Sequence, residues 1–145
     1  MTNKQQRKKA REAVLQALYA IHLSQENEEK VLRDINERYN FDLATKEFID
    51  ELFRNTINDR KVLDAKIEGA LENWDIERIN VIDRLIMQMA ILEMVSLIKY
   101  EIPYQVTISS AIENAKKFSS EDSTAFVNGI LDTCLLYTSP SPRDS

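Results

Sequence analysis

The sequence is poor in residues that form tight turns and in residues that bind metals. Among its 145 residues are two glycines, three prolines, one cysteine and one histidine. So few glycines argue against an all-β fold and a glycine-rich dinucleotide-binding domain, because both depend on glycine in their turns. One cysteine excludes an intramolecular disulfide and a cysteine-rich metal site. The single His22 leaves little scope for a histidine metal site or a catalytic triad. We therefore expect no metal.

A long apolar segment and a secretory signal are also missing. The least charged stretch, Leu85 to Ile98, has Glu93 as its only charge. It is shorter than the ~20 apolar residues that span a bilayer, so it predicts a helix buried in a soluble core. A carboxylate there needs a hydrogen bond or a cation, and we expect Glu93 to be a partnered structural charge. The N-terminus, MTNKQQRKKARE, leads into no apolar signal segment. These features predict a cytoplasmic protein without membrane contact.

No catalytic constellation is present either. Gly69 and Gly129 are isolated within helical patterns, so the chain has no glycine-rich phosphate loop. The carboxylates are spread along polar helix faces, and their spacing does not favour a hydrolase. The residues therefore give no support for an enzyme.

The last segment, CLLYTSPSPRDS at residues 134–145, differs in composition from the rest and contains the only cysteine and two of the three prolines. One reading frame of a transposase-based sequencing adapter encodes CLLYTSPSPRD. We therefore expect the native domain to be residues 1–133 and exclude 134–145, as one excludes expression tags. The alternative is a natural flexible tail rich in proline and serine. Because Leu135 and Leu136 lie near the helical phase of Ile130 and Leu131, the last helix is expected to run into this segment without functional meaning.

Apolar residues recur at the spacing of α-helices over almost the whole chain, and no convincing strand is found. We predict an all-α fold, a single domain of about seven helices joined by short loops. The apolar positions that define these helices are Ala10 to Ile21, Val31 to Ile35, Phe48 to Ile57, Val62 to Leu71, Val81 to Ile98, Ile108 to Phe118 and Phe126 to Leu131.

Polar residues and an aromatic mark where several helices begin or end. Thr45, Asn80 and Thr107 are the expected N-caps of the third, fifth and sixth helices. The second helix is expected to end near Tyr39, and the fourth to break near Trp74.

Charge is distributed unevenly along the chain. The net charge is −5, yet five cations fall within the first eleven residues: Lys4, Arg7, Lys8, Lys9 and Arg11. Such a cluster can contact phosphates, in which case binding should weaken steeply with salt. A solvated basic helix end would show the same pattern. This cluster is the clearest polar signal in the sequence.

Four segments together resemble the NusB family of transcription antitermination factors. They are RKKAREAVLQALYA at 7–20, IDRLIMQMAILEM at 82–94, IPYQVTISSAIENAKKF at 102–118 and EDSTAFVNGILD at 121–132. Residues 24–74 match only in helix pattern. The resemblance implies two perpendicular helical bundles, no catalysis and no cofactor. The implied partners are single-stranded boxA-type leader RNA, the ribosomal protein NusE and the RNA polymerase antitermination complex, chiefly in ribosomal RNA operons; homodimerisation stays open.

The resemblance also assigns roles to individual residues. Matching positions imply RNA contacts at Arg7, Lys8, Lys9, Arg11, Tyr19 and Phe126, and partner contacts at Tyr19, Asp83 and Asp122. Phe126 could stack on a base, but its helical spacing fits a core position equally well, and the same ambiguity holds for Tyr19.

Three positions depart from the family pattern. Gln88 replaces an arginine found in many members, and Ala125 replaces a basic residue, so both departures are expected to weaken RNA binding. Ser110 stands where a glutamate would close a capping box with Thr107, which is expected to cost on the order of half a kcal/mol.

Two other functions fit the same residues. The chain could be the N-terminal NusB-like domain of a ribosomal RNA cytosine methyltransferase, which would require a methyltransferase domain downstream. It could also be a helical protein-interaction module without RNA affinity.

Overall fold

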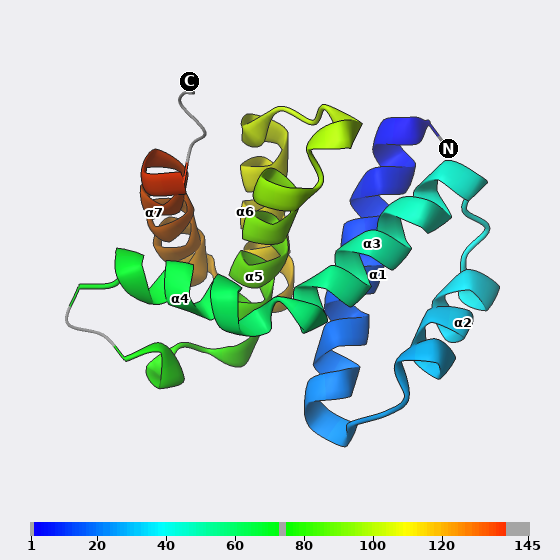
Figure 1. Ribbon diagram of the computed structural model, residues 1–145, viewed down its shortest axis with the longest axis horizontal. Helices are drawn as coiled ribbons and strands as arrows, with labels where there is room; N and C mark the ends of the chain where they lie inside the picture. The colour runs from blue at the N-terminus through cyan, green and yellow to red at the C-terminus, as the bar shows by residue number, and fades with distance from the viewer. Residues whose placement is uncertain (1, 73–74, 139–145) are drawn as a thin grey trace. The chain divides into compact units, whose positions relative to one another are not determined.

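The computed structural model describes residues 2–72 and 75–138, and these residues are almost entirely helical (Figure 1). Trp74, where we expected a helix break, lies outside them. No strand occurs in the described part of the chain, which confirms the all-α prediction. The elements are α1 Asn3–Ser24, α2 Glu28–Arg38, α3 Leu43–Asn58, α4 Arg60–Ala70, α5 Val81–Ser96, α6 Tyr104–Phe118 and α7 Glu121–Thr138, with short 3-10 helices η1 Ile76–Arg78 and η2 Ile98–Tyr100.

The helices form two compact units, Met1–Asp59 and Arg60–Ser145. This division corresponds to the two bundles that the family resemblance implies. The first unit contains α1, α2 and α3, and the second contains α4 to α7.

In the first unit, α1 packs against α3 and α2 (Figure 1). The apolar face predicted for α1 is confirmed, since Ala10, Val14, Ala17 and Leu18 are all buried. The third helix buries Phe48, Ile49, Leu52 and Phe53 against it, again as the spacing predicts. The second helix ends at Arg38, next to the expected boundary at Tyr39.

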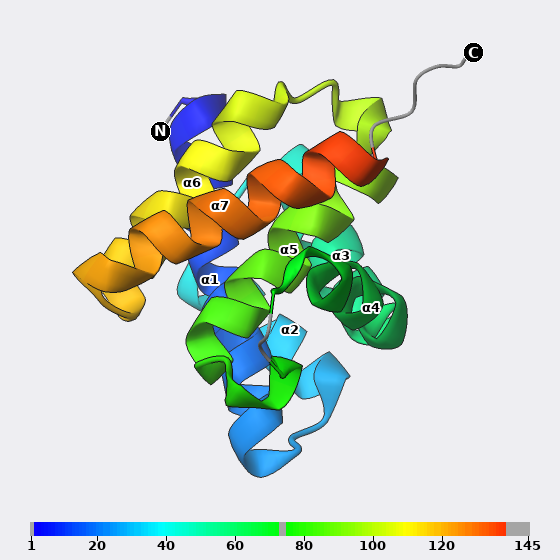
Figure 2. The same cartoon turned by 90° about the vertical axis from the view of Figure 1, so that its left-hand side faces the viewer.

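In the second unit, α5 is the central helix and contacts α4, α6 and α7 (Figure 2). Every residue from 85 to 93 is buried, which confirms the predicted core helix. The helix ends at Ser96 rather than at Ile98, which lies in η2 and is exposed.

The N-cap predictions had different outcomes. Asn80 caps α5 as expected, and its Oδ1 accepts a 2.8 Å hydrogen bond from the Ile82 backbone N–H. The Thr45 prediction is wrong, because the chain enters α3 earlier and Asp42 is the N-cap. The Oδ1 atom of Asp42 accepts a 2.8 Å hydrogen bond from the Thr45 backbone N–H.

The predicted cap at Thr107 is also wrong. The sixth helix begins at Tyr104 with Pro103 as its N-cap residue, so Thr107 lies one turn inside it. Its Oγ1 donates a 2.6 Å hydrogen bond to Glu93 Oε2, which confirms Glu93 as a partnered, buried carboxylate. The capping-box argument about Ser110 fails with it, since Ser110 is a buried residue within the helix.

The apolar face of α4 is displaced from the predicted one. Leu63 and Ile67 are buried, whereas Val62 is 59% exposed. The two buried positions are four residues apart and therefore share a helix face, and α4 packs against α5 and α7.

The last helix continues beyond Thr133 to Thr138, as the phase of its leucines predicts. Cys134 is buried, and its Sγ lies 3.5 Å from the Lys66 carbonyl oxygen of α4. Leu136 is 80% exposed.

Candidate nucleic-acid interface

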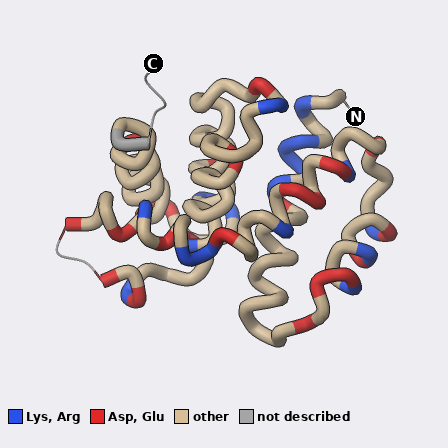
Figure 3. Tube along the Cα trace, in the orientation of Figure 1, with Lys and Arg blue, Asp and Glu red and all other residues tan. Residues whose placement is uncertain are grey.

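The cations predicted to contact RNA lie along the first turns of α1, where Figure 3 shows blue segments gathered. Lys4, Lys8 and Lys9 are exposed, and Arg7 is half-buried. Arg11 is only 6% exposed, so the structure places it in the protein interior rather than on a phosphate-binding surface. The exposed lysines and Arg7 therefore define the cationic surface.

The ring of Phe48 on α3 holds the two arginines of this cluster. The guanidinium carbon of Arg7 lies 4.9 Å from the ring centroid and that of Arg11 lies 5.6 Å from it. Cation–π contacts at such distances are worth about 0.5 to 2 kcal/mol each. Phe48 is itself fully buried, so it fixes both side chains to α3. Sequence spacing identifies Phe48 as a core residue but gives no sign of this second role.

Cations in the first turns of a helix are electrostatically unfavourable there. They face the positive end of the helix dipole, and Lys4 with Lys8 and Arg7 with Arg11 are like charges at i, i+4. Hydrogen bonds at the helix start offset this cost. The Thr2 side chain accepts from the Gln5 backbone N–H, and the Gln5 side chain accepts from the Thr2 backbone N–H, at 3.1 and 2.9 Å. This capping box satisfies backbone donors that the helix leaves free.

A second set of hydrogen bonds joins α1 to the start of α3. Gln6 Nε2 donates to Asp42 Oδ2 at 3.0 Å, and the Asp42 backbone N–H donates to Gln6 Oε1 at 2.9 Å. The pKa of Asp42 lies below its usual value of 3.8, chiefly because of its hydrogen bond with Thr45, with smaller effects from Gln6 and the charge of Arg7. The stability that Asp42 contributes is therefore present above pH 3.8 and is lost as the pH falls through the lowered pKa.

Tyr19 lies near the other end of α1, roughly 16 Å along the helix axis from Lys8 at 1.5 Å per residue. The residue is 36% exposed, and its ring stacks on that of His22, with centroids 6.5 Å apart and an interplanar angle of 11°. The side chain is therefore available for contact.

Three predicted site residues lie around the start of α7. Asp122 is exposed in its first turn, and Phe126, one turn further on, is half-buried. Asp83, on α5, is only 5% exposed and accepts a 2.8 Å hydrogen bond from Ser123 Oγ. Its Oδ1 is buried without a hydrogen-bond partner among the described residues. Asp83 thus faces α7 inside the second unit, which does not fit the predicted partner contact.

Gln88 is also interior. Its Nε2 donates a 2.7 Å hydrogen bond to Asp64 Oδ1 on α4, and Arg84 Nη2 donates to Asp64 Oδ2 at 2.7 Å. The hydrogen bond with Asp64 raises the pKa of Arg84 above its usual value, against a smaller opposing effect of burial. Gln88 is therefore buried between α4 and α5 and joins the two helices. Ala125, by contrast, is exposed, so that departure falls on the surface.

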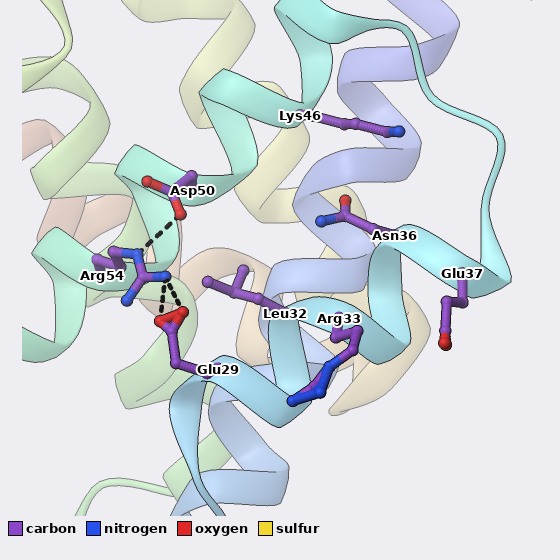
Figure 4. Close-up of a pocket in the computed structure, with 8 residues that line it drawn as sticks. All are labelled: Glu29, Leu32, Arg33, Asn36, Glu37, Lys46, Asp50 and Arg54. Atoms are coloured by element: carbon purple, nitrogen blue, oxygen red, sulfur yellow. Dashed lines mark hydrogen bonds and ion pairs between the residues drawn. The ribbon is translucent and has the colours of Figure 1, made fainter.

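A pocket lies between α2 and α3 in the first unit (Figure 4). Figure 4 shows Arg54 reaching between Asp50 and Glu29, with hydrogen bonds of 2.7 Å from Nε to Asp50 and 2.8 Å from Nη2 to Glu29 Oε1. Those hydrogen bonds raise the pKa of Arg54, the one with Asp50 most. Arg33 and Lys46 line the same pocket, as do Leu32, Asn36 and Glu37. Carboxylates already engage Arg54, so the pocket is poorly suited to phosphate.

Over residues 2–72 and 75–138, no group of three metal-ligating side chains comes together. No helix in these ranges is long and apolar enough to cross a membrane. The fold and the site define a small all-helical protein whose distinctive surface is a cationic helix start.

Comparison with known proteins gives the family. The NusB family model matches residues 8–135, and the chain belongs to this family. A relative from Thermodesulfovibrio yellowstonii, named transcription antitermination protein NusB, is 41% identical, with 87% of this chain and 89% of the relative covered. A relative of the same name from Bacillus thuringiensis is 39% identical, with 86% and 93% covered. These relatives are named as antitermination proteins and not as enzymes.

Solved structures agree with the fold. T. maritima NusB superposes with a TM-score of 0.82 at 34% identity, covering 92% of this chain and 93% of the other. A structure of antitermination factors NusB and NusE in complex with dsRNA gives a TM-score of 0.78, covering 94% and 99%. At 22% identity, this second likeness is one of fold.

Proposed function

We propose that this protein is a non-enzymatic, cytoplasmic transcription antitermination factor that binds leader RNA through the cationic start of α1 and acts together with NusE. The observation that carries the proposal is the gathering of exposed lysines on one helix start in a chain of net charge −5. The names of the family relatives support the antitermination role.

The lysines supply affinity, and other side chains supply selectivity. Lys4, Lys8 and Lys9 neutralise phosphates, which makes binding salt-dependent. Single-stranded RNA is read through unstacked bases that stack on aromatic rings, and the exposed ring of Tyr19 is suited to such a contact. The dsRNA named in the neighbouring structure makes duplex RNA the natural competitor in a binding test.

NusE is the proposed protein partner, and the RNA polymerase antitermination complex is the assembly in which both act. Asp122, exposed in the first turn of α7, is the acidic residue suited to a basic partner. Complementary charge would speed the encounter and set its orientation. Asp83 supports this surface from inside through Ser123, the neighbour of Asp122.

The test is RNA binding by the double variant Lys8→Ala/Lys9→Ala, measured by fluorescence anisotropy with a boxA-type RNA over a salt series. Removing two phosphate contacts should make the negative slope of log K against log salt shallower by about 1.4 and weaken binding to all RNAs. The matched control is Arg60→Ala/Lys61→Ala, which removes two exposed cations from the second unit. An unchanged affinity for the α1 variant, or an equal loss in the control, would contradict the proposal.

The methyltransferase alternative is not favoured. The chain covers 89% and 93% of the two relatives, which leaves no room in them for a further catalytic domain. An interaction module without RNA affinity would bind NusE and fail the anisotropy test at low salt.

A further inference from the structure

The hydrogen bonds between Gln6 and Asp42 lie beside the proposed RNA-binding lysines. We propose that these two residues form a clasp that positions the cationic start of α1 on α3 for RNA binding. Gln6 and Asp42 would thus be positioning residues, not RNA contacts. This inference rests on the proposed function and deepens it.

The clasp is compact and partly sheltered. Gln6 is buried, although it stands among exposed cations, and both ends of its amide are engaged by Asp42 at 3.0 and 2.9 Å. Asp42 is at the same time the N-cap of α3 through Thr45 at 2.8 Å. Two hydrogen bonds therefore fix the two helix starts to each other, and the carboxylate that accepts one of them also caps α3.

The clasp lies where the start of α1 is most prone to fray. Gln6 precedes Arg7, Lys8 and Lys9 directly, where repulsion between cations and the helix dipole favour fraying. A frayed helix start would spread these charges over many arrangements. The apparent affinity for RNA falls in proportion to the fraction of molecules with the start in place.

The hydrogen-bond polarity of the clasp is fully determined. The Asp42 backbone N–H needs the Gln6 oxygen, so the Gln6 NH₂ group faces the Asp42 side chain. The Thr45 backbone N–H faces the other oxygen of that side chain. Both side-chain atoms at position 42 must therefore accept, which a carboxylate can do and an amide cannot.

This polarity allows a test with Asp42→Asn, for which an effect of charge alone and an effect of positioning would change RNA affinity in opposite directions. Asp42→Asn removes a negative charge beside the cations, which should tighten RNA binding if charge alone matters. Asparagine is as good an N-cap as aspartate, so α3 keeps its start. In the clasp, however, the new NH₂ group at position 42 would face either the Gln6 NH₂ group or the Thr45 backbone N–H, and two donors cannot bond to each other. We expect binding to weaken by about threefold to tenfold, the effect of one lost hydrogen bond.

The double variant Gln6→Glu/Asp42→Asn supplies the rescue. The new glutamate accepts from both the backbone N–H of position 42 and the new asparagine NH₂, while the asparagine oxygen accepts from Thr45. The clasp is restored with reversed polarity, and the net charge equals that of the wild type. RNA affinity should return to within about twofold of the wild-type value. Gln6→Ala, compared with Gln16→Ala at an exposed position of the same helix, provides a second break of the clasp.

The experiment measures anisotropy with boxA-type RNA over a salt series, and amide hydrogen exchange at residues 7–9. Asp42→Asn and Gln6→Ala should bind more weakly with an unchanged salt slope, because no cation is lost, and exchange should be faster. Tighter or unchanged binding by Asp42→Asn would overturn the inference, as would failure of the double variant to recover. If the wild type binds no RNA at low salt, the proposed function fails, and the positioning role fails with it.

Discussion

In the first unit, two of the polar contacts between helices are partly buried or exposed, whereas the second unit contains two that are buried. Gln6 with Asp42 joins two helix starts, and Arg54 spans an open pocket. Glu93 with Thr107 and Asp83 with Ser123 are buried pairs within the second unit. Buried polar pairs fix the packing of a core, while partly exposed contacts order a surface. The comparison assigns the scaffold to the second unit and the cationic surface to the first.

The largest expected effect tests whether α5 is the centre of the second unit. Ile91→Ala at a fully buried position should lower the free energy of unfolding by about 2 to 5 kcal/mol, because it leaves a cavity. Val95→Ala, one turn further on at a partly exposed position, should cost under about 1 kcal/mol. Urea unfolding followed by circular dichroism measures both, and equal costs would contradict the central role of α5.

A smaller effect tests the buried polar pairs. Thr107→Val keeps the side-chain shape but removes the hydroxyl that donates to Glu93, and should cost about 1 to 3 kcal/mol. Thr124→Val is the matched control, because that hydroxyl bonds only to the carbonyl of Glu121 in its own helix. The same unfolding experiment applies. If Thr107→Val lowers the free energy of unfolding no more than the control does, the hydrogen bond between Thr107 and Glu93 does not stabilise the fold.

The smallest effect compares the ion pairs of the two units. The side chains of Arg84 and Asp64 are 24% and 17% exposed, while Arg54, Glu29 and Asp50 are 35%, 62% and 51% exposed. Arg84→Gln should cost about 1 kcal/mol and Arg54→Gln under about 0.5 kcal/mol. Unfolding at low and high salt is the measurement. Salt should diminish the cost at Arg54 and leave the cost at Arg84 largely unchanged; the reverse order would contradict the division.

Apolar spacing was sufficient to predict the seven helices, because burial of one helix face leaves a direct trace in the sequence. The N-caps were harder. Asp42 and Thr45 are both good capping residues three positions apart. Thr107 is a good capping residue as well, whereas Pro103, the N-cap residue of α6, makes no side-chain cap hydrogen bond and gives no such signal. The spacing cannot decide between such candidates. Residue type alone favours a helix start at Thr107, but its hydroxyl donates to the buried Glu93 instead.

The candidate site was predictable where it depends on charge and unpredictable where it depends on contacts between distant segments. The exposed lysines of α1 are visible as a cluster in the sequence. Gln6 with Asp42 and Asp83 with Ser123 are separated by 36 and 40 residues. These pairings, like the burial of Arg11 over Phe48, arise only once the helices pack.

Cys134 is a natural probe for local opening of the second unit. It is the only thiol in the chain and is buried where α7 meets the carbonyl oxygen of Lys66 on α4, and burial raises its pKa. A thiol reagent in solution cannot react with it until the end of α7 moves away from α4. The labelling rate would therefore report how often this helix end opens, residue-specifically and without any introduced probe.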